Sequence, residues 1–272
     1  MFGWFRTVCP CDPAAKRWVE DRLRWLTKQF GLHVFLERPV ITPTEEFFPD
    51  AYDSSPRSAK VLFHRVCDYM GVDPDDVELE LFNDTSNVGM DIFGQGRGYA
   101  AGLWSSDEGH EEQGDFTRPR GWHQPIQGLV RIERSNLDRP ADLIGVMAHE
   151  LAHQRLLGEK RYEREFDNEC LTDLTAVFFG LGVFLANNPR KSTGEIGYWP
   201  GTKLVKPEYL SEPMLGYALA HLAWHRDEDW PAWAKHLRWA PRAVFKQGLK
   251  FLQKTAESTF KPVRLRSMGK DE

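Results

Sequence analysis

The motif His149-Glu150-Leu151-Ala152-His153 carries the side chains that metal-dependent hydrolysis needs. Residues four apart in a helix lie on the same face, so the two imidazoles can bind one metal ion. Glu150 can then take a proton from a metal-bound water, because the metal lowers the pKa of that water. The spacing therefore indicates a zinc site with Glu150 as the general base. A catalytic zinc usually has three protein ligands, so one more is required.

Glu169 is the best candidate for the third ligand. It belongs to the sequence Asn-Glu-Cys-Leu-Thr-Asp at residues 168–173, in which Glu169 and Asp173 lie one helical turn apart. Glu169 can bind the metal while Asp173 accepts a hydrogen bond from the outer ring nitrogen of His149. Such a contact fixes the imidazole and raises its basicity. The sixteen positions from His153 to Glu169 leave room for one helix to end and the next to return antiparallel.

Glu159 and Glu165 are alternative third ligands. Glu159 stands where the pattern HExxHxxGxxH has its last histidine, but Leu156 replaces the glycine that would turn the chain. We therefore expect a straight helix that carries Glu159 away from the metal. Glu165 lies closer in sequence to the HExxH motif than Glu169 does, which leaves less room for the turn. Cys170 points about 100° away from Glu169 in an ideal helix and is expected to be a buried thiol.

The elements that position these motifs are mostly helices. Apolar spacing predicts two early helices, each stopped by a glycine, then a block of strands, then an almost wholly helical remainder. Separate helical and strand blocks indicate an α+β fold. The expected helices are residues 14–30, 57–70, 140–157, 165–187, 211–226 and 241–258, and the expected strands are residues 77–82, 98–104 and 128–134.

Composition narrows the class of protein. The chain has 272 residues, of which 41% are hydrophobic, which is enough for a full core. A net charge of −5 gives no electrostatic reason to expect nucleic acid or membrane binding. Residues 174–186 form the most apolar stretch, which is too short for a bilayer and predicts a buried helix. We expect a cytoplasmic protein, because four scattered cysteines do not form a disulfide framework and the N-terminal residues do not resemble a secretion signal.

The sequence HELAH followed by NECLTD resembles the gluzincins, the zinc peptidases that include thermolysin-like enzymes and the minigluzincins. Residues 77–190 follow the same order of elements in looser form, and only the motif residues are specific. The resemblance implies a zincin-like core, in which a small, mostly antiparallel sheet supports the HExxH helix and the third-ligand helix. Extra helices are expected at both ends. The expected division is an N-terminal segment (1–56), the catalytic core (57–190) and a C-terminal helical subdomain (191–272).

The resemblance also implies that a peptide substrate lies along the edge strand near residues 99–104. Main-chain hydrogen bonds would hold it there, which makes Tyr99, Ala100, Ala101 and Gly102 the expected substrate-binding residues.

A donor for the developing oxyanion is a further requirement. Tyr217, His221 and His225 recur every four residues and share one helix face, so a phenol or an imidazole from this face is a candidate. Tyr217 and His221 are the better candidates. The alternative is that these residues form the polar edge of a packed helix.

These features predict a zinc-dependent peptidase that needs Zn²⁺ and a peptide or protein substrate. A zinc-activated water would attack the peptide bond with Glu150 as general base. The alternative is a zincin-like regulatory protein that binds one dedicated protein partner and has little or no general proteolytic activity. A deformylase-like amide hydrolase would need a cysteine ligand on an upstream strand, and no cysteine lies in an expected strand. The oligomeric state is left open.

Two features lie outside this scheme. Cys9-Pro10-Cys11 could place a thiolate on the zinc, or could hold two free thiols without a special role. Arg242, Lys246, Lys250 and Lys254 form a basic stripe that is typical of a solvated helix face, with an acidic partner or nucleic acid as the alternative.

Overall fold

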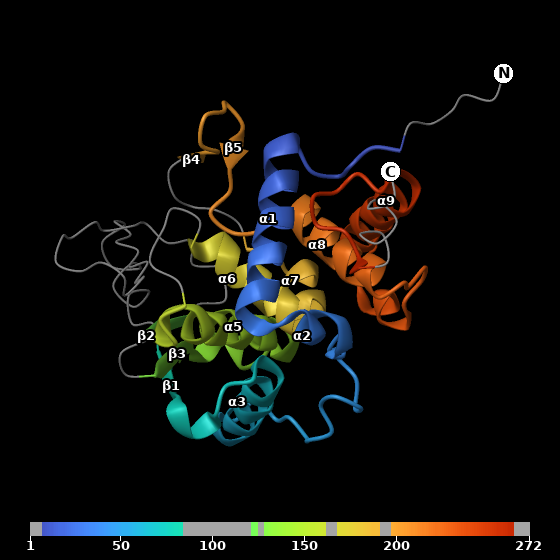
Figure 1. Cartoon of the computed structure of the whole chain (residues 1–272). Coiled ribbons are helices and arrows are strands. Elements are labelled where there is room, and N and C mark those ends of the chain that lie inside the picture. Colours follow the sequence, from blue (N-terminus) through green and yellow to red (C-terminus); the bar gives the residue numbers. More distant parts are fainter. Residues whose placement is uncertain (1–6, 84–120, 125–127, 162–167, 191–196, 264–272) are drawn as a thin grey trace, which may run out of the picture. The chain divides into compact units, whose positions relative to one another are not determined.

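The computed structural model describes residues 7–83, 121–124, 128–161, 168–190 and 197–263 (Figure 1). These residues form many helices, a three-stranded sheet and a two-stranded hairpin, which confirms a mixed helix-and-sheet class. Contacts group the chain into two units. The sheet unit comprises Pro43–Asn168 and Lys191–Glu195, and the helical unit comprises Met1–Thr42, Glu169–Arg190 and Ile196–Glu272. The zincin-like core and the division at residues 56 and 190 stay predictions.

The sheet unit contains strands β1 (Glu78–Phe82), β2 (Gly121–Gln124) and β3 (Leu129–Glu133) in the order β1-β3-β2. β1 runs parallel to β3 and β2 runs antiparallel to it, so these strands include one pairing of each kind. Val130 and Ile132 alternate with half-buried residues and are fully buried. The strands expected at 77–82 and 128–134 are confirmed, and the one expected at 98–104 lies outside the described residues.

Helices α3 (Pro56–Met70) and α5 (Pro140–His153) complete the core of the sheet unit, and α5 also contacts β2 and β3. Ser55 caps α3 by accepting a hydrogen bond from the amide of Ser58, and Gly71 ends the helix with a left-handed φ of 66°. Short 3-10 turns at Pro74–Asp76 and Arg134–Asn136 connect the elements. Apolar side chains from both helices are buried: Leu62, Phe63, Val66, Leu143, Ile144 and Met147.

The helix that carries HExxH continues past His153, but as a π-helical turn over Gln154–Gly158. The amides of Glu159 and Arg161 donate to carbonyls five residues earlier. The helix therefore extends as far as the sequence predicts, but its last turn is π-helical and not α-helical. The wider turn buries Leu156 while the Arg155 guanidinium donates to the carbonyl of Gly71 at 2.9 Å.

The helical unit is built from α1 (Pro13–Phe30), α2 (Leu32–Glu37), α6 (Asn168–Ala176), α7 (Gly182–Asn187), α8 (Glu212–His225) and α9 (Trp239–Thr255). A π-helical segment (Val177–Leu181), a 3-10 helix (Ala232–His236) and the hairpin β4 (Gly197–Tyr198) with β5 (Val205–Lys206) complete it. Asp12 caps α1 by accepting from the amides of Ala14 and Ala15. The helices expected near both ends are confirmed, whereas α2 was not expected.

The helix expected at 165–187 is interrupted. Gly180 has a φ of 98°, which separates α6 and the π-helical segment from α7. A Cβ at this position would lie 2.3 Å from the carbonyl oxygen of Pro39, and the Gly180 carbonyl accepts from the amide of Ile41. Glycine is thus required for this close approach of two backbones.

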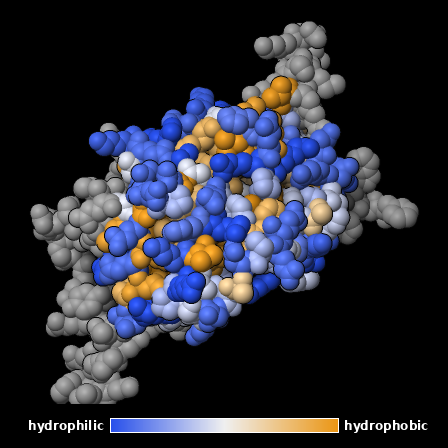
Figure 2. Space-filling model, turned by 90° about the horizontal axis from the view of Figure 1, so that it is seen from below, coloured by the Kyte–Doolittle hydropathy of each residue, from blue (hydrophilic) through white to orange (hydrophobic). Residues whose placement is uncertain are grey.

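The expectation of a buried apolar helix is confirmed. Among the described residues, Glu169–Asn187 is long and apolar enough to cross a membrane, which is longer than the apolar stretch expected from the sequence, and 94% of its most apolar 18-residue window is buried in the structure. On the face in Figure 2, hydrophilic residues predominate and hydrophobic ones form separate patches. The cytoplasmic location stays a prediction.

Two residues of the basic stripe on α9, Arg242 and Lys246, make contacts with nearby residues. Arg242 donates to the backbone carbonyls of Lys235 and Leu237, and the Lys246 ammonium lies 4.3 Å from the ring centroid of Trp230. Lys250 and Lys254 are exposed. These contacts agree with the expected solvated face.

A buried carboxylate ties three parts of the helical unit together. Glu20 on α1 is fully buried and lies 3.0 Å from the Lys16 ammonium. It accepts hydrogen bonds from the Tyr217 hydroxyl of α8 at 2.7 Å and from the amide and hydroxyl of Thr259 at 2.9 Å. Burial acts to raise the pKa of Glu20, but the bonds from Thr259, Tyr217 and Lys16 outweigh it and hold the pKa below its usual value.

Replacement of Glu20 by Gln should destabilise the protein by about 2 kcal/mol at pH 7, because charged hydrogen bonds become neutral or are lost. The pKa of Glu20 is lower in the folded protein than in the unfolded chain, where it is about 4.3. The charged carboxylate therefore stabilises the fold above that pH, and this stabilisation is lost as the pH falls through the folded pKa. The difference in the free energy of unfolding between wild type and Glu20→Gln should therefore be smaller at pH 3 than at pH 7. Denaturant unfolding at both pH values measures it, with the exposed Glu37→Gln as control. Equal stability of Glu20→Gln and wild type at pH 7 would contradict this role.

Candidate metal centre

His149 and His153 lie on α5 and are only 1% and 2% exposed. Their ring centroids are 4.8 Å apart and the ring planes are nearly perpendicular, at 84°. The i, i+4 spacing produces this pairing, because both side chains project from the same helix face. Leu143, Met147 and Leu151 are fully buried and keep this helix within an apolar environment.

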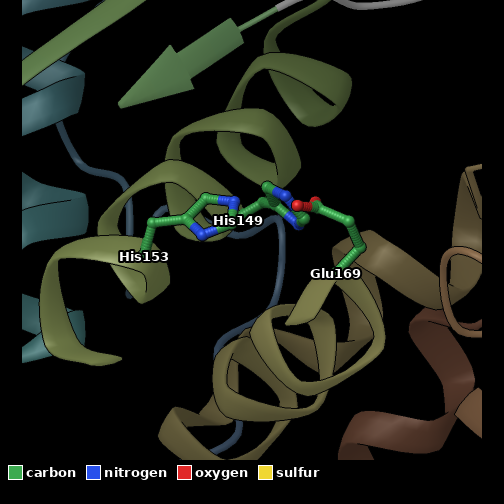
Figure 3. A group of neighbouring side chains, drawn as sticks. All are labelled: His149, His153 and Glu169. Carbon is green, nitrogen blue, oxygen red and sulfur yellow. The ribbon is translucent and has the colours of Figure 1, made fainter. Parts of the chain in front are cut away.

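Glu169 completes the group from the first turn of α6 (Figure 3). One ring nitrogen of each histidine and one carboxylate oxygen of Glu169 all lie within 4.8 Å of one another. A tetrahedral zinc with bonds of about 2.1 Å holds its ligands about 3.4 Å apart, so small side-chain rotations would close the site. Two imidazoles and one carboxylate form a donor set used by catalytic zinc, with a fourth position for water. The group can therefore hold a metal ion.

The structure brings together the three ligands expected from the sequence, His149, His153 and Glu169. Glu159 is not part of the group. Its carboxylate pairs with Arg155 and Arg161, each at 2.6 Å, at the end of the π-helical turn. Glu165 and the expected substrate-binding residues Tyr99, Ala100, Ala101 and Gly102 lie outside the described residues.

Asp173 is 3% exposed, and its Oδ2 accepts a hydrogen bond from the amide of Leu210 at 3.0 Å. This contact orients the carboxylate on α6. The expected hydrogen bond from His149 to Asp173 stays a prediction. Cys170 is buried and its thiol donates to the carbonyls of Pro207 and Glu208, each at 3.1 Å, so the expectation of a buried thiol is confirmed.

Tyr209 is a candidate site residue that the sequence did not indicate. It lies in the segment 207–210, which Cys170 and Asp173 fasten to α6 on either side of the tyrosine. Burial, followed by the negative charge of Glu169, raises the pKa of Tyr209 well above its usual value, although Arg190 opposes this shift. The Arg190 guanidinium lies 5.5 Å from the ring centroid. The phenol therefore keeps its proton and can act as a hydrogen-bond donor.

Tyr217 belongs to the Glu20 network, and the His221 ring lies 4.0 Å from the Glu20 carboxylate. The Tyr217 hydroxyl donates to Glu20, and burial raises its pKa. His221 is fully buried, and its pKa is lowered by burial and by the neighbouring His225 and Lys16, so its ring is neutral. The His225 Nδ1 lies 2.8 Å from the carbonyl oxygen of His221. These contacts fit the alternative of a polar edge on a packed helix, and a role as oxyanion donor stays a prediction.

Glu150, the expected general base, follows His149 on α5 and is 2% exposed. A carboxylate in such a poorly hydrated position interacts more strongly with nearby charge than one in water does.

Comparison with protein-family models, with curated proteins and with solved structures gives no match. The chemistry of the site is therefore the basis for assigning a function, and the resemblance to gluzincins rests on the two motifs.

Replacing Glu169 by Ala should remove bound zinc, because the site would keep only two ligands. The loss of affinity should exceed the roughly 10–100-fold that is typical for residues outside the ligand set. Metal analysis of the purified protein after dialysis, together with a zinc titration, measures this. Glu159→Ala is the matched control, since the Glu159 carboxylate pairs with Arg155 and Arg161 and is not part of the group. Undiminished zinc in Glu169→Ala would remove this ligand assignment.

Proposed function

We propose that the protein is a zinc-dependent peptidase of gluzincin type. The observation that carries the proposal is the grouping of His149, His153 and Glu169, which come from two motifs separated in the sequence. Two histidines from HExxH and a glutamate from NExxxD are the ligand set that this class of enzyme requires. Glu150 lies within the first motif and is buried, as a general base in a water-poor site should be.

When bound, a zinc ion would supply a Lewis acid that polarises the peptide carbonyl and lowers the pKa of the attacking water. His149, His153 and Glu169 would hold that ion. Glu150 would accept the proton of the water and later pass it to the leaving amine, which is the usual dual role of a carboxylate in this chemistry. Asp173, already oriented by the Leu210 amide, would support a ligand histidine.

Tyr209 is our candidate for the donor that stabilises the oxyanion. Hydrogen bonds of Cys170 and Asp173 hold its segment against α6. Burial and the negative charge of Glu169 raise the pKa of its phenol. A donor held in place before the reaction costs no reorganisation when charge develops on the substrate oxygen. Tyr209 fits this requirement better than Tyr217, whose hydroxyl already donates to Glu20.

Glu150→Gln should retain zinc and lose peptide hydrolysis by about 10²–10⁴-fold, because an amide cannot accept the proton. Mass spectrometry of a mixed peptide library and of casein would detect the products, with Glu159→Gln as control. Hydrolysis that persists in Glu150→Gln would show that the mechanism is wrong. A wild-type protein that cleaves neither substrate but captures one protein stoichiometrically would instead favour the regulatory, partner-binding alternative.

Tyr209→Phe should lower kcat by about 10–1,000-fold with little change in KM, since the lost hydrogen bond forms mainly in the transition state. Tyr198→Phe is the matched control, because Tyr198 lies on β4 and is 57% exposed. Tyr217→Phe should change stability and leave kcat unchanged. An unaltered kcat in Tyr209→Phe would remove Tyr209 from the mechanism.

A further inference from the structure

The stretch that contains α9 has a charge opposite to that of the whole protein. Residues 230–256 contain six Lys or Arg and no Asp or Glu, whereas the whole chain carries −5, so the other residues together carry −11. The three acidic residues at 227–229 precede this stretch, and including them still leaves a net charge of +3. A local excess of one charge indicates a surface that meets a partner of the opposite charge.

Helix α9 turns its lysines towards solvent. Its apolar side chains Phe245 and Leu252 are buried, and the helix packs against α8 (Figure 1). Lys246, Lys250 and Lys254 are exposed. At 100° per residue they lie within about 80° of one another around the helix axis, so they form one outer face. Among the described residues, no carboxylate forms an ion pair with any of the three.

Two exposed tryptophans belong to the same face. Trp239 begins α9 and is 84% exposed. Viewed down the axis of an ideal helix, it projects between Lys246 and Lys250. Trp230 is 53% exposed, and the Lys246 ammonium lies 4.3 Å from its ring centroid. Packing within the protein does not account for indole rings this exposed, and exposed apolar groups that are surrounded by polar ones mark interaction sites.

The side chains of this face suit a lipid surface better than nucleic acid. Base recognition relies on Arg, Asn and Gln side chains that reach the edges of bases. The Arg242 guanidinium and the Gln247 amide donate to backbone carbonyls, and Gln253 donates to the Asp229 carboxylate. Lysine ammonium groups and indole rings remain. Lysines attract anionic headgroups, and tryptophan rings prefer the boundary between headgroups and acyl chains.

We propose that the outer face of α9, together with Trp230, binds a membrane surface that contains anionic lipids. Lys246, Lys250 and Lys254 interact with the headgroups, and the Trp239 ring enters the interfacial layer. A lysine close to an anionic surface strengthens binding by about fivefold, so the three together contribute about 100-fold. The residues of the candidate metal centre are not part of this face, and the proposal does not depend on the proposed peptidase activity.

Co-sedimentation of the full chain with vesicles tests the proposal without any variant. At about 0.1 M salt, vesicles of phosphatidylcholine with about 30% phosphatidylserine should bind the protein at least about tenfold more tightly than phosphatidylcholine alone. Raising the salt to about 0.5 M should weaken this binding at least about tenfold, because screening becomes stronger. Absence of binding, equal binding to both kinds of vesicle, or binding that is independent of salt would overturn the proposal.

Replacement of Lys246, Lys250 and Lys254 by Gln tests the face itself. This triple variant should bind the anionic vesicles about 100-fold more weakly than wild type. The matched control removes the same charge from exposed lysines of other elements: Lys28→Gln, Lys60→Gln and Lys203→Gln. It should bind within about twofold of wild type, because these lysines lie outside the face. Circular dichroism checks that both variants are folded. An equal loss of binding in the two triple variants would refute the assignment to α9.

Trp239→Ala tests the contact with lipid. Anionic vesicles with brominated acyl chains should quench part of the tryptophan fluorescence of wild type and less of that of Trp239→Ala. Equal quenching in both proteins would contradict the placement of Trp239. Labelled single-stranded DNA in the same buffer provides the comparison with nucleic acid. If DNA binds more tightly than the anionic vesicles do, and the triple α9 variant loses that binding, the face belongs to nucleic acid and the proposal fails.

Discussion

Burial of ionisable side chains in an apolar helix is the constraint on which the site depends. His149, Glu150 and His153 lie on α5 at 2% exposure or less, beside Leu143, Met147 and Leu151 at zero. A polar group taken from water costs several kcal/mol unless it finds a partner, and a charge costs more. A cation bound by both imidazoles and by Glu169 would offset the cost of burying His149, His153 and Glu169. The donor groups that are expensive to bury are thus the groups to which the proposed function gives a role.

Helix α6, which carries Glu169, is restrained by a later segment of the chain. Cys170 and Asp173 form hydrogen bonds with residues 207, 208 and 210, so a segment 37 or 38 positions later in the chain is held against α6. Hydrogen bonds between buried side chains and backbone groups, donated by Cys170 and accepted by Asp173, fix position more strictly than apolar contact does, because their geometry is directional. This is why Tyr209, in a connector without regular structure, has a defined place beside α6.

The sequence was enough to predict the structural features that depend on the spacing of nearby residues. The i, i+4 histidines, the Glu169–Asp173 pair and the amphipathic helices follow from the helical period, and glycines marked where α1 and α3 end. It did not reveal the π-helical turn after His153, the break at Gly180 or Tyr209. Each of these depends on contacts between distant residues, such as the approach of Gly180 to Pro39. The bond between Tyr217 and Glu20 spans 197 positions, and no local pattern signals it.

The helical unit also shows how a fully buried charge can have a structural role. Glu20 has hydrogen-bond or ionic partners on Lys16, Tyr217 and Thr259, so its carboxylate joins α1 to α8 and to the segment that follows α9. Each of these partners also lowers the free energy of the charged carboxylate, which would otherwise be costly to bury.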